Sequence, residues 1–224
     1  MMLLGWDALR SSDWSQLSHA YGPATDTPGH LERLFEDDHA GWAKTIDHLY
    51  WSVTHQSSVT TATPPAALVV AGLLGDQRLD QPITADGLEP KPVSAHLLDF
   101  LAIVAEGTEP DRTEGEVWDA YCGPPIDELD MVWRSKPFTE GYEAVIKCRE
   151  VCPALVDPVL QRLTADDLHT RLAATSTAAL LGLVPSVTNR RAEIIKLLEA
   201  IAHSADIHHE RAHALVERLA RSTR

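Results

Sequence analysis

The string at residues 209–213 reads HERAH and has the HExxH pattern of zinc metallohydrolases. On a helix its two histidines lie one turn apart on one face and can ligate zinc, while the glutamate can act as a general base. Two features weigh against this hypothesis: Arg211 places a charge between the ligands, and Glu217 is the only downstream carboxylate. We therefore predict no catalytic residue and no metal, with His209 and His213 as ligands only if the HExxH interpretation holds.

Cysteine offers a second possible metal site. Cys148 and Cys152 lie four residues apart on a predicted helix, and His169 or His203 could complete a ligand set. Structural zinc sites usually take closely spaced pairs from loops, so we interpret these residues as reduced helix cysteines. Neither a Gly-rich phosphate loop nor a Gly-x-Ser-x-Gly context is present, and we predict no cofactor.

The segment 106–136 concentrates negative charge. Nine carboxylates lie between Glu106 and Asp130 against Arg112 alone, a net charge of −8, and aromatic residues are interleaved among them. Such a surface suits a basic protein partner, because charge speeds encounter and aromatic rings supply affinity. The alternative is a solvated loop whose aromatic rings pack back onto the body. The partner-binding candidates in this segment are Glu114, Glu116, Trp118, Asp119, Tyr121, Asp127, Glu128 and Trp133.

A second candidate surface lies on the helix that we predict after Asp38. One face of this helix carries an apolar stripe at helical spacing, and the opposite face carries polar residues around a tryptophan. The alternative is that a neighbouring helix or the N-terminal segment covers this tryptophan. The stripe consists of Trp42, Ile46, Leu49 and Val53, and the candidate binding face consists of Lys44, His48, Trp51 and His55.

Helices are expected throughout, with no convincing strand. The predicted helices are Trp14–Ala20, Thr27–Phe35 with Thr27 as N-cap, 38 to about 55, Pro64–Leu74, Val93–Ala105 (buried through Leu97, Leu98, Leu101 and Val104) and Phe138–Val151, followed by helix pairs from Pro153 onward. The regions are N-terminal capping helices (1–36), helix pairs (37–105), an acidic irregular insertion (106–136), and further helix pairs with a C-terminal cap (137–224).

The last third of the chain repeats itself. Asp166 and Arg171 recur as Asp206 and Arg211, 40 positions later in each case, and an apolar helical run precedes each unit. A period of about 40 residues built from two helices is typical of an α-solenoid. The pattern of an Asp-bearing turn followed five residues later by Arg resembles HEAT repeats. That resemblance implies an all-α, right-handed α-solenoid of stacked antiparallel helix pairs, about five in number. It also implies a structural ladder between repeats formed by Asp166, Arg171, Asp206 and Arg211.

The N-terminal region adds to this resemblance. The run His19-Ala20-Tyr21-Gly22, followed by Asp26-Thr27-Pro28, is similar to uncharacterised actinobacterial HEAT-repeat proteins, as are Tyr50-Trp51, His55-Gln56 and Ala62-Thr63. The match is weaker at the first helix pair, because the residue five positions after Asp37 is Trp42, where the repeat pattern has an arginine. This family is defined by the stacking of its helix pairs, so the resemblance says almost nothing about function.

Charge is unevenly placed along the 224 residues. Residues 1–135 carry 7 Lys and Arg against 22 Asp and Glu, a net of −15, whereas residues 136–224 carry 12 against 11, a net of +1. An acidic half repels phosphate backbones, so we expect no nucleic-acid partner. The sequence lacks both an apolar run long enough to cross a membrane and a basic signal-peptide start, and an odd number of cysteines fits a reducing compartment. We expect a cytoplasmic location.

These observations favour a non-catalytic HEAT-like module for protein–protein interaction. One alternative is an immunity or inhibitor protein that binds a basic toxin or enzyme, and another is a scaffold that uses both solenoid faces. Two enzymatic alternatives are the metallohydrolase at 209–213 and a nucleic-acid enzyme similar to the HEAT-like alkylpurine DNA glycosylases, which are basic as this chain is not. The sequence leaves the oligomeric state open.

Overall fold

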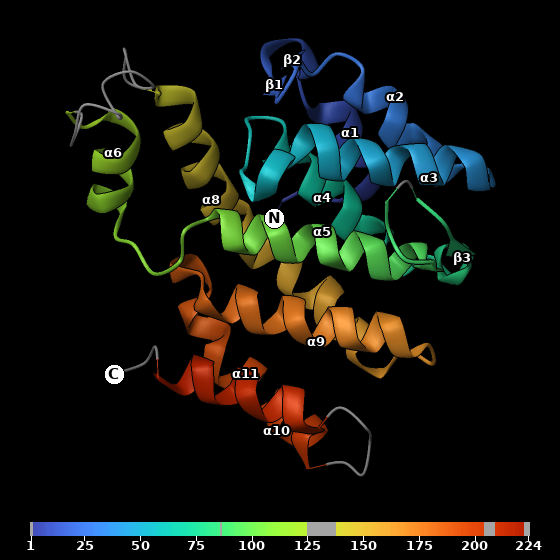
Figure 1. Ribbon diagram of the computed structural model, residues 1–224, viewed down its shortest axis with the longest axis vertical. Coiled ribbons are helices and arrows are strands. Elements are labelled where there is room, and N and C mark those ends of the chain that lie inside the picture. Colours follow the sequence, from blue (N-terminus) through green and yellow to red (C-terminus); the bar gives the residue numbers. More distant parts are fainter. Residues whose placement is uncertain (1, 86, 125–137, 204–208, 222–224) are drawn as a thin grey trace.

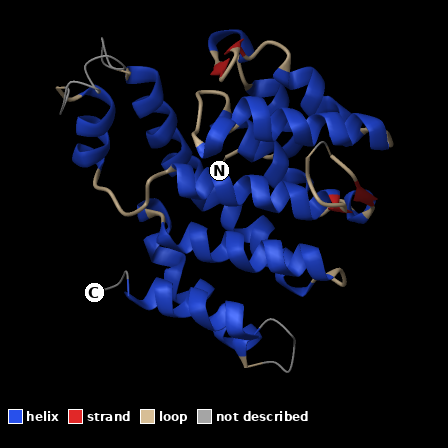
Figure 2. Ribbon diagram, in the orientation of Figure 1, coloured by secondary structure: helices blue, strands red, loops and turns tan. Residues whose placement is uncertain are grey.

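The fold is all-α, as predicted, in the computed structural model (Figure 2). The structure describes residues 2–85, 87–124, 138–203 and 209–221, with the backbone alone for residues 209–212. The described α-helices are α1 (Gly5–Ser11), α2 (Thr27–Glu32), α3 (His39–His48), α4 (Thr63–Leu73), α5 (Val93–Gly107), α6 (Glu114–Cys122), α8 (Thr139–Leu160), α9 (Leu168–Leu183), α10 (Arg191–Ala202) and α11 (His209–Arg221).

Short irregular helices extend or connect these elements. The 3-10 helices are η1 (Trp14–Gln16), η2 (Arg33–Phe35), η4 (His55–Ser57), η5 (Gln77–Asp80), η6 (Gln161–Thr164) and η7 (Pro185–Arg190), and η3 (Leu49–Val53) is a π-helix that continues α3.

Two small antiparallel hairpins are the strands that the structure describes. In the first, β1 (Ser18–His19) pairs with β2 (Gly22–Pro23), and in the second, β3 (Pro82–Ile83) pairs with β4 (Lys91–Pro92). The first hairpin corrects our prediction of a helix over Trp14–Ala20, of which only η1 is helical. The Ser18 backbone explains the difference, because its N–H donates to Thr61 Oγ1 at 2.8 Å and its carbonyl accepts from Ala62 N–H at 3.1 Å.

The helices pack in two series. In one series α3 contacts α5, α5 packs extensively on α9, and α9 contacts α11. In the other, α1 packs on α4 and α4 packs on α8, while α10 covers α9 and α11. Figure 1 shows α3, α5 and α9 one below another across the view. Segments far apart in sequence thus become neighbours, because α6 and the start of α8 leave the stack between α5 and α9.

Apolar residues at helical spacing form the core. All four residues of the predicted stripe on the long helix, Trp42 to Val53, are fully buried, which confirms that prediction. The predicted buried face of α5, from Leu97 to Val104, is likewise fully buried. Periodicity identified these faces correctly because apolar residues at helical spacing share one side of a helix. Helix α5 is also buried beyond its predicted face, for example at His96 and Phe100.

Helix α8 corrects the prediction that a new helix begins at Pro153. The helix runs unbroken from Thr139 to Leu160 and contains both Pro153 and Pro158. A proline inside a helix removes the hydrogen bond to the carbonyl four residues earlier, which for Pro153 is the carbonyl of Arg149. Ser186 of η7 donates its hydroxyl to this carbonyl and so replaces the missing bond.

The start of α2 also differs slightly from expectation. The predicted helix over Thr27–Phe35 is present as α2 and η2, but its N-cap is Asp26 rather than Thr27. Thr27 is instead a fully buried residue inside the first turn. This position brings its hydroxyl into a cluster of histidines that is described below.

Among the described helices, none is by itself both long and apolar enough to cross a membrane. The pair Leu168–Leu183 and Pro185–Ala202 meets the length and composition criteria only jointly, and it is bent by 110° at the break.

Candidate functional site

An acidic arm, which we define as residues 108–122 together with the first turns of α8, projects from the body (Figure 1). Its helix α6 lies inside the segment that we predicted to be irregular. A capping box starts this helix: Thr113 Oγ1 accepts from the Glu116 N–H at 3.3 Å, and the Glu116 carboxylate accepts from the Thr113 N–H at 2.8 Å. These reciprocal bonds satisfy two otherwise unpaired N–H groups and explain why a helix begins here.

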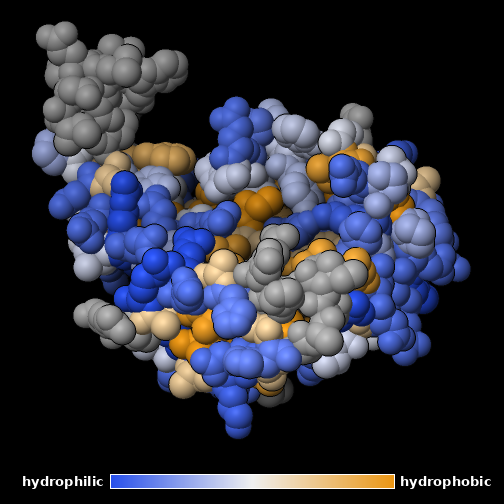
Figure 3. All heavy atoms as spheres, turned by 60° about the horizontal axis from the view of Figure 1, so that its bottom comes forward, coloured by the Kyte–Doolittle hydropathy of each residue, from blue (hydrophilic) through white to orange (hydrophobic). Residues whose placement is uncertain are grey.

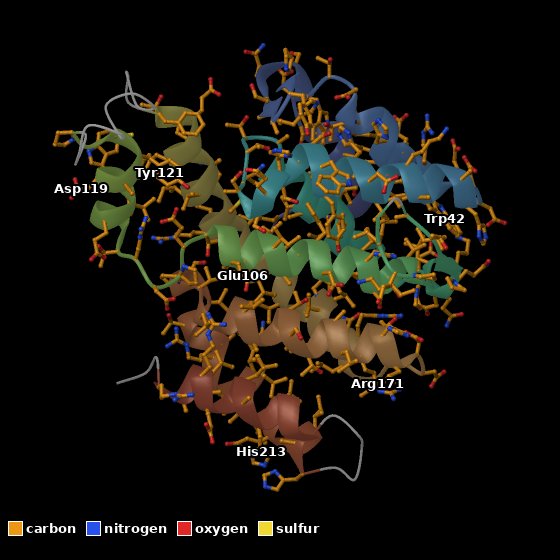
Figure 4. The ribbon with its side chains drawn as sticks, viewed as in Figure 1. Trp42, Glu106, Asp119, Tyr121, Arg171 and His213 are labelled. Carbon is orange, nitrogen blue, oxygen red and sulfur yellow. The ribbon has the colours of Figure 1, made fainter. Side chains whose placement is uncertain are left out.

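Exposed carboxylates line α6. Glu114, Glu116 and Asp119 are all exposed, as predicted for a binding surface. Figure 4 places Asp119 on the outer side of α6 and Tyr121 toward α8. Hydrogen bonds from Thr113, first from its backbone and then from its hydroxyl, lower the pKa of Glu116. The helix therefore presents a fixed negative surface at neutral pH.

Aromatic rings lie among these carboxylates. Trp118 is 46% exposed, and its ring stands edge-on to Tyr142 of α8 with 5.0 Å between centroids. The Tyr142 hydroxyl donates to Glu114 Oε1 at 2.9 Å and so ties α8 to α6. Phe138 is also exposed. The contact with Tyr142 therefore holds the Trp118 ring, and the exposed part of the ring can contact a partner.

Arg149 of α8 anchors the base of the arm. Its buried guanidinium donates to the carbonyl oxygens of Thr108 at 2.9 Å and of Glu109 and Arg112 at 2.8 Å each. Glu109 has a left-handed backbone with φ of 51°, which costs energy for a residue with a side chain. The three bonds from Arg149 hold the chain in this turn as it leaves α5.

Glu109 also connects this turn to α6. Its carboxylate accepts from the Tyr121 hydroxyl at 2.9 Å and from Arg112 at 2.7 Å. Burial, followed by the hydrogen bond to Glu109, raises the pKa of Tyr121 to about 12. Tyr121 therefore supports the arm from within and is only half-exposed, and its contact with a partner stays a prediction.

A hollow of about 430 Å³ lies at the foot of the arm. Glu106, Glu109 and Asp111 line it together with Arg112 and with Arg218 of α11. Three carboxylates against two guanidinium groups leave this hollow negative on balance. Of the remaining arm candidates, Asp127, Glu128 and Trp133 lie outside the described residues.

The four residues of the second predicted binding face differ in exposure. Lys44 is exposed, and Trp51 is 51% exposed, so neighbouring segments cover only about half of this tryptophan. His48, however, is buried, and His55 is half-buried. The N-terminal segment covers this side of α3, since the Ala20 N–H donates to the Ser52 carbonyl at 3.0 Å.

His48 belongs instead to a histidine cluster, defined as His19, Asp26, Thr27, His30 and His48. His19 Nδ1 accepts from the Tyr21 N–H at 3.1 Å, so the proton of the neutral ring lies on Nε2, which donates to Asp26 Oδ1 at 3.0 Å. His48 Nε2 lies 2.9 Å from Thr27 Oγ1, and its ring stacks on His30 with 4.2 Å between centroids and 4° between planes.

Burial and charge set the protonation of this cluster. Burial, followed by repulsion from His30, lowers the pKa of His48 to about 4, and burial also lowers the pKa of His30. Burial alone would raise the pKa of Asp26, but the His19 hydrogen bond and the nearby histidine charges outweigh it and the pKa falls. At neutral pH His48 is therefore neutral, while Asp26 is ionised.

Sequence reasoning did not find this cluster. Its members come from β1, from the residues around the start of α2 and from the end of α3. Helical spacing relates Asp26 and Thr27 to His30 on α2, but no spacing relates these positions to His19 or His48, so only the folded N-terminal segment brings all of them together. The resemblance drawn from His19-Ala20-Tyr21-Gly22 and Asp26-Thr27-Pro28 marked part of this stretch, but not its proximity to His48.

The remaining candidates lie on or just before α9, on α11 and in the segment between α10 and α11, and only some of them are among the described residues. Arg171 donates to the carbonyl oxygens of Ala165 and Asp166 at 2.8 Å, contacts that lie within its own unit, so the inter-repeat ladder stays a prediction. Asp206 lies outside the described residues, as does the Arg211 side chain. Figure 4 shows Arg171 on α9 and His213 on α11, well separated from each other.

The two motif-based metal candidates have different outcomes. The HERAH string opens α11, where His213 is exposed and lies 5.8 Å from His203 between ring centroids, but the His209 side chain is not described. Cys148 and Cys152 are both buried, whereas His169 and His203 are exposed. Burial raises the pKa of Cys148 well above its ordinary value and that of Cys152 to about 12, so both are protonated thiols in the core.

A groove of about 570 Å³ lies between α9 and α10. Its walls include Leu163, Leu172, Leu197 and Ile201, with Asp166 and Arg171 at one side. Figure 3 views the molecule from this end and shows apolar side chains between hydrophilic ones. The groove therefore combines apolar walls with a charged edge.

Comparisons of the chain with models of protein families, with curated proteins and with solved structures give no match.

Proposed function

We propose that this chain is a non-catalytic helical-repeat module that binds a basic protein partner through its acidic arm. The observation that carries the proposal is the half-exposed Trp118 ring, which packs perpendicular to Tyr142 on a helix whose carboxylates are exposed. Tryptophan is enriched among the residues that dominate binding energy, and surrounding charge speeds encounter with an oppositely charged partner.

The repeat architecture is part of this proposal. From α3 to α9, consecutive body helices alternate between the two packing series: α3, α5 and α9 fall in one, and α4 and α8 fall in the other, while α10 and α11 pack on each other and on α9. Alternation of this kind supports a right-handed, HEAT-like α-solenoid in which the arm is an insertion between α5 and α8. Such a stack gives the arm a rigid base, which suits a recognition element.

The arm has features of a preformed binding element. The capping box, the Tyr142–Glu114 bond and the three Arg149 bonds fix its backbone and side chains before a partner arrives. Preorganisation reduces the entropy that is lost on association. Between Glu106 and Cys122 six carboxylates oppose Arg112 alone, which favours a positively charged partner surface.

A partner that is itself a basic toxin or enzyme fits the same surface, and in that case the chain acts as an immunity or inhibitor protein. A cytoplasmic location completes the proposal, because the three cysteines are free and two of them are buried in the core.

The test uses the full chain as bait in a native lysate, with mass spectrometry of the retained proteins at about 0.1 M and about 1 M NaCl, between which the Debye length falls from about 10 to about 3 Å. We expect one basic protein that is retained at low salt and lost at high salt. Trp118→Ala should weaken its binding by at least about 2 kcal/mol, or roughly 30-fold. The double variant Glu114→Gln/Asp119→Asn should weaken it by about 1–2 kcal/mol.

A matched control removes the same number of exposed charges elsewhere. Glu32→Gln/Glu199→Gln changes two exposed glutamates, one on α2 and one on α10, and should retain wild-type capture. Equal loss in this control and in the arm variant would show that net charge alone causes binding. Equal capture by Trp118→Ala and wild type would place the binding site away from the arm.

A further inference from the structure

The histidine cluster contains an arrangement of donor atoms that the proposed function does not use. His19, Asp26 and His48 each offer one ligand atom, a ring nitrogen or a carboxylate oxygen, and all three atoms lie within 4.8 Å of one another. Two imidazole nitrogens with one carboxylate oxygen form a donor set that is typical of zinc and related transition metals. We propose that His19, Asp26 and His48 bind one divalent transition-metal ion of the zinc class.

The three ligands come from three separate segments that are already fixed in place. His19 ends β1, Asp26 precedes α2, and His48 ends α3. The hairpin of β1 and β2 is tied to the body, since Ser18 bonds Thr61 at 2.8 Å and the Ala20 N–H bonds the Ser52 carbonyl at 3.0 Å. An ion at this point would join the N-terminal hairpin to the long helix at little cost in chain entropy.

His30 supplies an independent observation. Its ring stacks on His48 and fixes the plane of that ligand, and its Nδ1 is buried with no hydrogen-bond partner among the described residues. Buried polar atoms in folded proteins are nearly always paired, so this nitrogen calls for an explanation. A metal ion with an open coordination position brings a bound water, and that water is a partner for such an atom.

Binding requires a defined change in the protons of the cluster. His19 now carries its proton on Nε2, because its Nδ1 accepts from the Tyr21 N–H. A neutral imidazole that binds metal through Nε2 must carry the proton on Nδ1 instead. The proton thus moves from Nε2 to Nδ1 within one ring, with no net release, and the Tyr21 N–H loses its acceptor.

His48 undergoes a simpler change. Its Nε2 exchanges the hydroxyl of Thr27, now 2.9 Å away, for the metal ion. The metal-free form is therefore a closed network of hydrogen bonds, and the ion replaces its contacts with coordinate bonds. This competition predicts that binding perturbs the Tyr21 amide, a signal that surface adsorption to other histidines would not produce.

The donor set also predicts which ions bind. Ca²⁺ and Mg²⁺ prefer oxygen ligands, six or more of them in many sites, and the cluster offers a single carboxylate. Zn²⁺ and Co²⁺ accept nitrogen and oxygen together in tetrahedral sites, with three protein ligands and one water. We expect binding of Zn²⁺ and Co²⁺ and no binding of Ca²⁺ or Mg²⁺.

The experiment titrates Zn²⁺ into the metal-stripped full chain by calorimetry and follows Co²⁺ by its visible absorption, which is intense when the ion is four-coordinate. Wild type should bind one ion per chain and rise in melting temperature. His19→Gln and Asp26→Asn should each weaken binding by at least about 100-fold, because loss of a direct ligand exceeds the roughly 10–100-fold cost of losing an outer partner.

His213→Ala is the matched control, since it removes an exposed histidine that belongs to the HERAH string. It should bind zinc as wild type does, and the Tyr21 amide resonance should shift on zinc addition in both proteins. Melting of each variant without metal confirms that it is folded. Absence of zinc binding in the wild-type chain overturns the proposal. Binding that persists in His19→Gln and Asp26→Asn, or that disappears in His213→Ala, also overturns it.

Discussion

The acidic arm and the histidine cluster each gather polar and aromatic side chains, but they hold them differently. On the arm, the backbone is fixed by the capping box and Arg149, while Glu116, Trp118 and Asp119 extend into solvent. In the cluster, the side chains hold one another, as in the stacked pair of His30 and His48.

This difference shows what each region suits. Exposed side chains on a rigid backbone can contact a protein surface, and their charges act over a distance. Mutually bonded and largely covered side chains can exchange their bonds only for those of something small. The comparison is therefore between a surface for a macromolecule and a site for an ion, and the following variants test it in order of expected effect.

The largest effect is expected from Arg149→Met, which removes the anchor of the arm. Three bonds from a buried guanidinium are lost, and hydrogen bonds to charged groups contribute about 1.5–3 kcal/mol each, so we expect destabilisation by at least about 3 kcal/mol. Urea unfolding measures the loss, and hydrogen exchange should show faster exchange in α6 than in α3.

Arg112→Met is the control for this change, because Arg112 is exposed and pairs with Glu109 near the surface. Its cost should stay within about 1 kcal/mol. If both variants lose equal stability, the arm is not anchored through Arg149. If the amides of all helices exchange faster to the same extent in Arg149→Met, the arm does not unfold separately from the body.

The second effect is a loss of folding stability at acid pH, which we expect from a histidine buried in the body of the molecule. His96 of α5 is fully buried, both of its ring nitrogens are without hydrogen-bond partners among the described residues, and burial, followed by repulsion from Lys91, lowers its pKa to about 4. Because the unfolded chain binds this proton near pH 6.5, stability is complete above that pH and is lost as pH falls toward 4.

His96→Leu removes this linkage. The loss of unfolding free energy between pH 7 and pH 4 should shrink by up to about 3 kcal/mol relative to wild type, as measured by urea unfolding at several pH values. The two curves should diverge only below about pH 6.5. Parallel curves over this range would show that His96 does not contribute to acid sensitivity.

The smallest effect is expected at the start of α6. Thr113→Ala removes the N-cap hydroxyl and should cost about 1 kcal/mol, confined to the arm. Hydrogen exchange at the first amides of α6 measures it, and the melting temperature of the body should barely change. Thr113→Ser keeps the hydroxyl and should behave as wild type, so a loss in both variants would exclude the capping bond as the cause.

Sequence patterns predicted the parts of the fold that depend on one periodic element. The buried stripes on α3 and α5 follow from helical spacing, and both are confirmed. Pro153 misled the prediction, because a carbonyl freed by a proline can find another partner, here Ser186. That compensation comes from a later segment and has no signature near the proline.

In the candidate sites, too, local patterns predicted the features of single helices but not the contacts between distant segments. The carboxylates of α6 are exposed as the local composition indicated. His48 was assigned to an exposed face by helical spacing, yet the N-terminal segment covers it. Spacing along one helix cannot show which of its two polar sides another segment will occupy, so the histidine cluster required the structure.

The Ser186 hydroxyl on the Arg149 carbonyl has a consequence for how this sequence can drift over generations. Pro153 leaves the Arg149 carbonyl without its helical donor and Ser186 supplies another, so a substitution at either position changes the effect of a substitution at the other. A lineage that first exchanges Pro153 for a residue with a backbone N–H frees position 186 to vary. A lineage that first loses the Ser186 hydroxyl keeps Pro153, and the Arg149 carbonyl then lacks this hydrogen-bond donor. The order of the two changes therefore decides which of them is tolerated.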